Sequence, residues 1–428
     1  MTKARFRLVD TSVSRWYHCI SRCCRKAYLL SDENGFQRKE WIDQRLKELN
    51  EIFADICGQK RTGTACCICF SIWLILLTEP IVPLWSFAMT KARFRLVDTS
   101  VSRWYHCISR CCRKAYLLSD ENGFQRKDWI DQRLKELNEI FAISVGGFST
   151  MDNHLHLLLR IDCEEAENWS DQEVVERWFR LYPPRGVDRK PMKPSEEMVQ
   201  AKLNNSDWVR ETRSRLSSLG WFMKCLKEPL ARLANQQDGC TGAFFEGRYK
   251  SIAILDQESL LSVAAYIDLN PVAAGIVPLP EQSPHTSIKE RVDNAVAQGR
   301  MEDVEQIRNG SVAAQAVSGD IEDSLWLVPI EDRQRQGSLR KGIVEGFTLG
   351  QYLLLVDYTS RVVRKGKAVV SSELAGIFER LQSSAEIWSH RIKRLHEKTW
   401  IGRFLSASRD RLRALAGKLD VRHLANIG

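Results

Sequence analysis

Hydrophobic residues recur along the middle of the chain with two different periods, which predict a series of strands and helices. Residues 104–110 are rich in aromatic and β-branched side chains, which favours a β-strand. Residues 128–141 carry apolar side chains at helical spacing and predict an amphipathic helix. A short apolar run at 143–148 predicts a second strand, and a Met-Asp-Asn turn leads into a third strand at 154–161.

The pattern continues after a polar segment at residues 163–205, which we interpret as an insertion across the surface. A long helix is predicted from residue 208 to about residue 235, followed by a turn and a strand within 242–255. A further helix over 257–269 is expected to end before Pro271, because proline pushes the preceding residue away from helical geometry. This order predicts an α+β fold, a small antiparallel sheet with helices on one face.

An internal repeat sets the domain organisation. Residues 1–54 recur as residues 89–142 with a single difference, Glu40 against Asp128. Identity that complete indicates a recent duplication of the coding DNA, because structural repeats diverge while they keep a pattern. The second copy begins with its own methionine. We therefore interpret the second copy and all that follows it as the ancestral protein, and the first copy with its junction as an added fragment.

Residues 55–88 join the two copies and include an apolar run at 69–77. A membrane-spanning helix needs about 20 predominantly apolar residues. This run is shorter, and Glu79, Pro80 and Pro83 follow it. We therefore interpret the segment as junction sequence rather than as a membrane anchor, and we expect no membrane partner.

Composition narrows the class of protein. Of the 428 residues, 44% are hydrophobic and 27% are charged, which excludes a mainly disordered or fibrous chain. The net charge of +9 favours an anionic partner. The 13 cysteines are an odd number, without zinc-site spacing and without a secretory signal peptide, so we expect reduced thiols in a cytoplasmic protein. Residues 281–428 are expected to form a mainly helical, basic C-terminal region.

Two histidines and a tyrosine are the candidate chemical groups. His154 and His156 lie two apart on a predicted strand, so both rings project from one face, while leucines define the opposite, core face. Two adjacent imidazoles are a way to hold a divalent metal, and two incidental surface histidines are the alternative. Tyr266 and Asn270 are four apart and share a helix face. Together these residues predict a phosphoryl-transfer site.

The chemistry of such a site is consistent. A phenol with a pKa of about 10 is a poor nucleophile at neutral pH. A metal ion that polarises the phosphate makes attack feasible, and the product is a covalent phosphotyrosine. The alternative for Tyr266 is a packing role on the helix beside Val263 and Ile267.

Four stretches in residues 89–280 resemble the REP-associated tyrosine transposases, a branch of the single-tyrosine HUH transposases. The family often has an arginine where this chain has Ala273. The matching stretches lie in the family's order and are Tyr105 to Arg110, Met151 to Leu159, Phe244 to Ser251 and Tyr266 to Gly275.

The resemblance implies a ferredoxin/RRM-like fold and an HUH endonuclease that acts in DNA transposition. Such enzymes cleave single-stranded DNA beside hairpins or inverted repeats, with Mg²⁺ or Mn²⁺, through a 5′-phosphotyrosine. Mapped onto this chain, the nucleophile is Tyr266 and the metal ligands are His154, His156 and Asn270. The alternative is a DNA-binding relic that has lost cleavage. We expect a nucleoid-associated protein, and we expect any self-association to give a homodimer.

Several basic and aromatic side chains are candidate DNA contacts. The alternative for each is a solvated charge or a core aromatic, and we interpret the basic run at 361–367 as a solvated face. The candidates for phosphate binding are Arg110, Arg248 and Lys250, and those for base stacking are Trp104, Tyr105 and Phe245.

Overall fold

The computed structural model of the chain describes residues 40, 42–48, 51, 97–119, 123–300, 302, 319–334, 340–363, 378, 383–396, 404–406 and 425–426. Two compact units divide the chain, Met1–Lys91 with Gly239–Gly242 and Ala92–Asp238 with Ala243–Gly428. The predicted apolar junction at 55–88 lies outside the described residues. No helix within the described ranges is long and apolar enough to cross a membrane.

The two copies of the repeat share local structure where both are described. Residues 42–48 of the first copy are helical, and Arg45 forms an ion pair with Glu48. The equivalent residues of the second copy, Arg133 and Glu136, form the same pair within helix α3 (Arg126–Ile140). The same sequence therefore forms a helix in both copies. The ion pair recurs because its two residues are three apart and lie on one helical turn.

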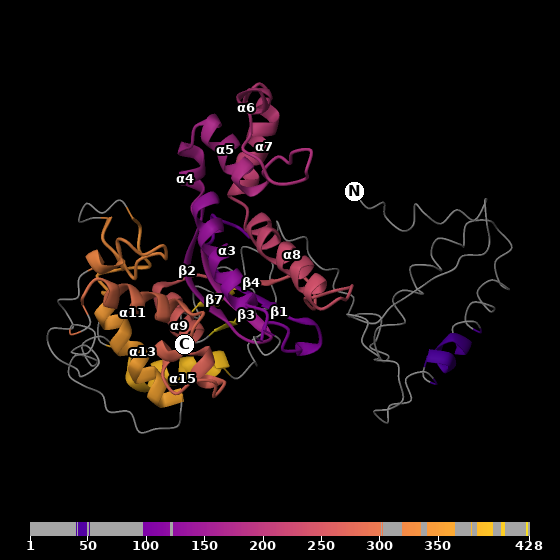
Figure 1. Cartoon of the computed structure of the whole chain (residues 1–428). Coiled ribbons are helices and arrows are strands. Elements are labelled where there is room, and N and C mark those ends of the chain that lie inside the picture. Colours follow the sequence, from indigo (N-terminus) through magenta and orange to yellow (C-terminus); the bar gives the residue numbers. More distant parts are fainter. Residues whose placement is uncertain are drawn as a thin grey trace. The chain divides into compact units, whose positions relative to one another are not determined.

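The second unit is built on a mixed sheet with the strand order β2-β3-β1-β4-β7-β8 (Figure 1). The first four strands in this order pair antiparallel, whereas β7 joins β4, and β8 joins β7, in parallel. The α+β fold class is as predicted, and β1 and β3 have the predicted bounds. The strands are β1 (Trp104–Arg110), β2 (Ile143–Thr150), β3 (His154–Ile161), β4 (Lys250–Ile254), β7 (Phe404–Ser406) and β8 (Ala425–Asn426).

Helices connect and follow these strands. A separate two-stranded sheet pairs β5 (Glu331–Asp332) with β6 (Val344–Glu345). The remaining α-helices of this unit are α4 (Cys163–Asn168), α5 (Asp171–Leu181), α6 (Glu196–Leu203), α7 (Ser206–Leu216), α8 (Leu219–Gln237), α9 (Gln257–Asp268), α10 (Asn270–Ala273), α11 (Ser287–Ala297), α13 (Leu349–Val363) and α15 (Ala385–His396).

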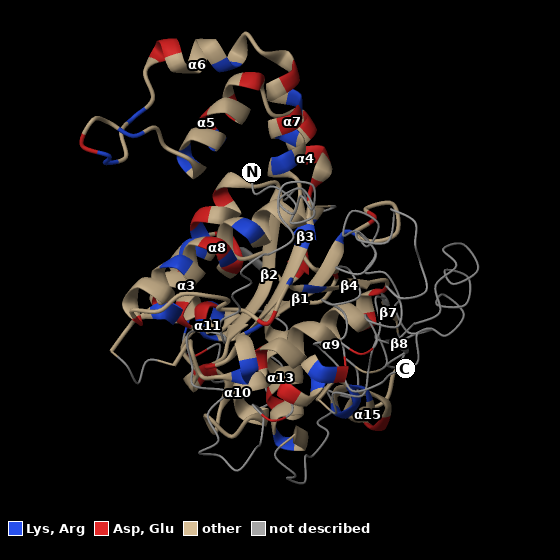
Figure 2. Ribbon diagram, turned by 90° about the vertical axis from the view of Figure 1, so that its right-hand side faces the viewer, with Lys and Arg blue, Asp and Glu red and all other residues tan. Residues whose placement is uncertain are grey.

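Helices cover both faces of the sheet, so the prediction of helices on one face is wrong. Leu155, Leu157 and Leu159 pack in a core with α3 and α8. Leu158 of the same strand points the other way and packs in a second core with Ile252, α9, α13 and α15. Figure 2 shows α3 and α8 on one side of the strands and α9 and α15 on the other. The prediction failed because the histidines of β3 were taken to mark a solvent face.

The segment 163–205, predicted as a polar insertion, contains α4, α5 and α6. The single helix predicted from 208 to about 235 is two helices, because Ser217 and Ser218 separate α7 from α8. Ser218 has extended backbone geometry, which interrupts the helical hydrogen bonds.

The helix before Pro271 ends at Asp268, one residue earlier than predicted. A short helix, α10, then begins at Asn270. Asn270 therefore belongs to a helix, although the residue before a proline was expected to leave helical geometry. Pro271 is tolerated there because the first residues of a helix need no hydrogen-bonded N–H group.

The C-terminal region is less purely helical than predicted. It supplies α13 and α15, and it also supplies β7 and β8 to the main sheet. The boundary at residue 280 stays a prediction, and most of the basic run at 361–367 lies outside the described residues.

Candidate functional site

Strand pairing places four predicted site residues on the face of the sheet that α9 covers. In the register of β1 and β3, Arg110 is opposite His154 and Ile108 is opposite His156. Lys250 of β4 is opposite Ile108 on the other side. Residues directly opposite each other project to the same face. Arg110 therefore lies beside His154, and Lys250 lies on the same face one strand farther away, beyond Ile108.

Tyr266 reaches this cluster from α9. The helix starts at Asp256, whose carboxylate accepts a hydrogen bond from the Ser259 N–H at 2.8 Å. Two turns later, the Tyr266 ring lies edge-on to the ring of His156, with centroids 5.4 Å apart. The Tyr266 side chain is only 8% exposed. The structure thus brings the predicted nucleophile and the predicted metal-binding histidine together.

Asn270 lies one turn beyond Tyr266 and is also buried. Its Nδ2 donates to the backbone carbonyl of Tyr266 at 3.1 Å. Because Nδ2 is used in this way, the amide oxygen Oδ1 is the atom of Asn270 suited to bind a cation.

His106 is a member of the site that the sequence analysis missed. Its Nε2 lies 2.9 Å from His156 Nδ1, and the two rings stack with centroids 5.1 Å apart. It also lies edge-on to Tyr266, at 5.8 Å between centroids. His106 is fully buried on β1. This contact follows from the register in which β1 pairs with β3, and that register was not predicted from the sequence.

His154 has a different partner. Its Nδ1 lies 2.6 Å from Asn153 Oδ1, and Asn153 Nδ2 in turn donates to the carbonyl of Lys114 at 3.0 Å. An amide oxygen only accepts hydrogen bonds, so Nδ1 of His154 carries the proton. In the neutral form of this ring the lone pair is on Nε2.

Burial sets the protonation states in the cluster. Burial lowers the pKa of His106 to about 3, and it holds the pKa of His156 well below its usual value, assisted by the neighbouring histidines and Arg110. Both rings are therefore neutral at neutral pH, which is the form that ligates metals. Burial raises the pKa of the Tyr266 phenol, although a hydrogen bond from Asn270 and the charge of Arg110 oppose the shift.

The donor set fits a divalent cation in one specific respect. Nε2 of His156 is buried and has no hydrogen-bond partner among the described residues, a costly arrangement unless another group binds it. No cluster of three or more His, Cys, Asp or Glu side chains suited to a metal occurs in the described ranges. A cation would therefore depend on His154, His156 and Asn270, with the substrate or water completing its shell.

Helix α15 covers the candidate nucleophile, Tyr266. The ring of His396, the last residue of α15, packs on the Tyr266 ring with centroids 4.7 Å apart. Two bonds anchor α15, from Trp388 Nε1 to Thr359 Oγ1 and from Arg391 Nη2 to Glu258 Oε2, each 2.9 Å. His396 lies in the region outside the resemblance, and no sequence signal pointed to it.

The predicted DNA contacts differ in their placement. Lys250 is exposed at the start of β4, and Arg110 is half-buried beside His154. Arg248 is also exposed, and it lies two residues before the start of the strand, outside the pairing. Tyr105 is a core residue whose hydroxyl bonds to the backbone of Asp98, and base stacking by Tyr105 is excluded in this arrangement.

The other two candidate stacking residues are also packed. Phe245 is buried in the core that contains α3 and α8, with Lys227 over its ring. Trp104 is half-buried, and the Arg160 guanidinium lies 5.4 Å from its ring centroid.

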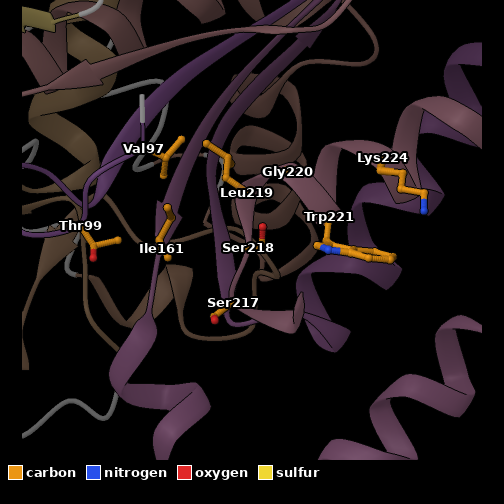
Figure 3. Close-up of a pocket in the computed structure, with 9 residues that line it drawn as sticks. All are labelled: Val97, Thr99, Ile161, Ser217, Ser218, Leu219, Gly220, Trp221 and Lys224. Carbon is orange, nitrogen blue, oxygen red and sulfur yellow. The ribbon is translucent and has the colours of Figure 1, made fainter. Parts of the chain in front are cut away.

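A pocket of about 430 Å³ opens at the start of α8, where Ser217, Ser218 and Trp221 line it together with Val97 and other residues (Figure 3). None of the residues lining it belongs to the histidine and tyrosine cluster. The pocket is therefore separate from the candidate site.

No protein-family model matches the sequence, and no curated protein matches it. Among solved structures, the chain is similar to one described as a REP-associated tyrosine transposase bound to a REP hairpin. The two share 11% sequence identity over 45% of this chain and 80% of that chain, with a TM-score of 0.27. A score that low carries no argument about this chain. The family indicated by the four motifs therefore remains a prediction, and the site rests on the residues described above.

Proposed function

We propose that this protein is a metal-dependent single-stranded DNA endonuclease and strand transferase that uses Tyr266 as its nucleophile in DNA transposition. The observation that carries the proposal is the buried contact between Tyr266 and His156, whose Nε2 has no hydrogen-bond partner among the described residues. A tyrosine packed on a histidine for structural reasons alone would not require a buried, unsatisfied ring nitrogen. The motif order supports the same interpretation.

In this proposal the chain's own residues bind and orient the scissile phosphate. Arg110 beside His154, and Lys250 on the same face of the sheet, would pair with phosphate oxygens. Tyr266 Oη attacks phosphorus, the bond from phosphorus to the 3′ oxygen breaks, and the proton lost by the phenol balances the one gained by the 3′ hydroxyl. A divalent cation at His154, His156 and Asn270 would supply charge neutralisation at the phosphate.

DNA entry requires α15 to move. Tyr266 is 8% exposed and His156 is 2% exposed, so a DNA strand cannot reach either residue in this arrangement, in which the His396 ring packs on Tyr266. The proposal therefore includes an opening of the C-terminal helix before cleavage.

The proposal is tested by detecting a covalent adduct between the protein and DNA. The full chain is incubated with Mn²⁺ and a 3′-end-labelled DNA hairpin carrying single-stranded flanks of randomised sequence. The expected product is labelled DNA attached to protein after boiling in detergent, together with an upstream fragment ending in a 3′ hydroxyl. Tyr266→Phe should form no adduct, because it lacks only the attacking oxygen. Tyr249→Phe is the matched control, since Tyr249 is a buried tyrosine near β4, and it should form the adduct. An adduct that persists in Tyr266→Phe would overturn the assignment.

The covered site also favours a second candidate, a DNA-binding relic that no longer cleaves. In that case the wild-type chain and Tyr266→Phe would retain the hairpin equally in a gel-shift experiment. Neither protein would form the adduct, with Mn²⁺ or without it.

A further inference from the structure

The two candidate metal-binding histidines share an arrangement at their Nδ1 atoms. Nδ1 of His154 lies 2.6 Å from Asn153 Oδ1, and Nδ1 of His156 lies 2.9 Å from His106 Nε2. Neither neighbour belongs to the predicted ligand set. In both rings the hydrogen bond therefore uses the nitrogen closer to the backbone.

This arrangement has a consequence for the ring protons. A neutral imidazole has one N–H donor and one lone pair, and the bond made by one nitrogen fixes the state of the other. Asn153 Oδ1 only accepts, so His154 must donate from Nδ1. If His156 also donates from Nδ1, both rings keep their lone pair on Nε2, the nitrogen farther from the backbone. If it accepts instead, His156 Nε2 carries the proton and cannot bind a cation.

We propose that Asn153 and His106 are positioning residues that hold the ring protons of His154 and His156 on Nδ1 and so direct both Nε2 atoms toward a divalent cation. This inference rests on the proposed function, because it assumes the same metal site. Metal-binding histidines usually donate their second N–H to a carboxylate, a carbonyl or water. In this chain the acceptors of those N–H groups would be the amide oxygen of Asn153 and the neutral imidazole of His106.

Each positioning residue is itself held in place. Asn153 donates from Nδ2 to the carbonyl of Lys114, so its Oδ1 is fixed toward His154. His106 is fully buried in the middle of β1, between the paired strands β3 and β4. Its burial disfavours a charged ring, which keeps Nε2 available as an acceptor for His156. The His106 contact is thus built into the strand pairing, whereas Asn153 lies in the turn just before β3 and is held by its bond to the Lys114 carbonyl.

The proton positions are measurable without metal. Two-bond ¹H–¹⁵N spectra of the full metal-free chain, labelled with ¹⁵N-histidine, distinguish the two neutral tautomers of each ring. His154→Gln and His156→Gln assign the signals. We expect the Nδ1–H form for both His154 and His156. An Nε2–H form at His156 would overturn the part assigned to His106.

Metal affinity provides a second measurement, by calorimetric titration of the full chain with Mn²⁺ alone. His106→Phe keeps a ring but has no acceptor, and should weaken Mn²⁺ binding by about 10- to 100-fold, the usual effect of losing such a partner. His106→Gln restores an acceptor oxygen and should recover most of the affinity. The control is His285→Gln, which removes a histidine bonded to Asp131 outside the cluster and should leave Mn²⁺ binding unchanged. Wild-type affinity in a folded His106→Phe protein would contradict the inference.

The Asn153 variants give a parallel pair. Asn153→Leu should weaken Mn²⁺ binding, whereas Asn153→Asp keeps an acceptor oxygen and should bind at least as well as the wild type. Failure of this inference is distinguishable from failure of the proposed function. If His154→Ala and His156→Ala do not weaken Mn²⁺ binding, the metal site itself is wrong. If they do and His106→Phe does not, only the positioning role of His106 is wrong.

Discussion

His396 packs its ring against the ring of Tyr266, with 4.7 Å between their centroids, and so joins the end of α15 to the candidate nucleophile. The two residues are 130 positions apart in the sequence, and His396 lies outside the region covered by the motif resemblance. The contact connects the C-terminal region to the candidate active site. It also explains why Tyr266 is nearly inaccessible to solvent.

Removing this ring should expose Tyr266. We expect His396→Ala to increase the rate at which tetranitromethane nitrates Tyr266 by several-fold, measured by mass spectrometry of tryptic peptides. His390→Ala is the matched control, because His390 is exposed on the same helix and should leave nitration unchanged. Equal nitration of all three proteins would show that α15 does not shield the tyrosine. The same substitution should increase adduct formation if opening of α15 limits cleavage.

Acid should destabilise the protein through its buried histidines. Burial lowers the pKa of His106 to about 3 and that of His396 to about 4, from an ordinary value of 6.5. In this range the unfolded chain binds more protons than the folded one, so stability is full above about pH 6.5 and falls as the pH decreases toward 4. For His396 alone the loss is on the order of 3 kcal/mol, a large part of a typical folding free energy of about 5–15 kcal/mol.

One histidine works in the opposite direction. Burial lowers the pKa of His285, but the hydrogen bond to Asp131 and its charge raise it above the usual value overall. The stability that this pair contributes is present at low pH and is lost as the pH rises through the folded-state pKa. The free energy of unfolding in urea, measured between about pH 4 and pH 8, gives the sum of these opposite effects. We expect net destabilisation in acid, with a shallower slope in His396→Ala; a flat profile would contradict the burial of these rings.

The strands were predictable from sequence because their signal is local. Alternation and apolar content fixed β1 and β3 at the observed bounds. Helices in the segment 163–205 were missed although a local signal was present. Ser170 accepts a hydrogen bond from the Glu173 N–H, and the pattern Ser-x-x-Glu is a helix-start signature. The polar composition of the segment outweighed that signal in the prediction.

The parts of the site that escaped prediction depend on long-range pairing. His106 contacts His156 only because β1 and β3 adopt one particular register. A shift of one residue would turn His106 to the opposite face. Tyr266 of α9 packs on His156, and His396 of α15 packs on Tyr266, so the residues that cover this part of the site come from far along the chain. Residue types and spacing therefore indicated Tyr266, His154 and His156, but not the groups around them.

Deleting residues 1–88 should leave a folded protein. The second copy supplies both β1 and α3, which lie in the central sheet and its core, so the first copy adds no element that this core lacks. We expect a chain beginning at Met89 to unfold within a few degrees of the full-length melting temperature and to form the same DNA adduct. Aggregation or loss of the adduct in the truncated chain alone would show that the first copy has a structural role, such as exchange between two subunits.

Asp268 should be worth more to stability than any other single polar side chain near Tyr266. Its buried carboxylate accepts hydrogen bonds from Ser287 Oγ, the Ile288 N–H and the Tyr352 hydroxyl, and so joins α9 to α11 and α13. Burial raises the pKa of this carboxyl, although the Ser287 and Tyr352 hydrogen bonds oppose the shift. Asp268→Ala leaves the Ile288 N–H and the Tyr352 hydroxyl without this acceptor, whereas Ser287 Oγ can still donate to the Phe148 carbonyl at 3.2 Å. At about 1–3 kcal/mol for each unsatisfied donor, we expect a total loss of roughly 2–6 kcal/mol in urea unfolding.

Variants that remove one hydrogen bond at a time test whether the bonds to Asp268 are the source of this stability. Tyr352→Phe removes one donor and leaves no buried polar group unpaired. The new ring has no polar atom, and the Asp268 carboxylate keeps two hydrogen-bond partners. It should cost only about 1 kcal/mol. Ser287→Ala should cost somewhat more, since Ser287 Oγ also accepts from the Phe148 N–H on β2 at 3.0 Å. If Asp268→Ala is no worse than Tyr352→Phe, the three hydrogen bonds do not act together, and the position of Tyr266 on α9 must be fixed by apolar packing alone.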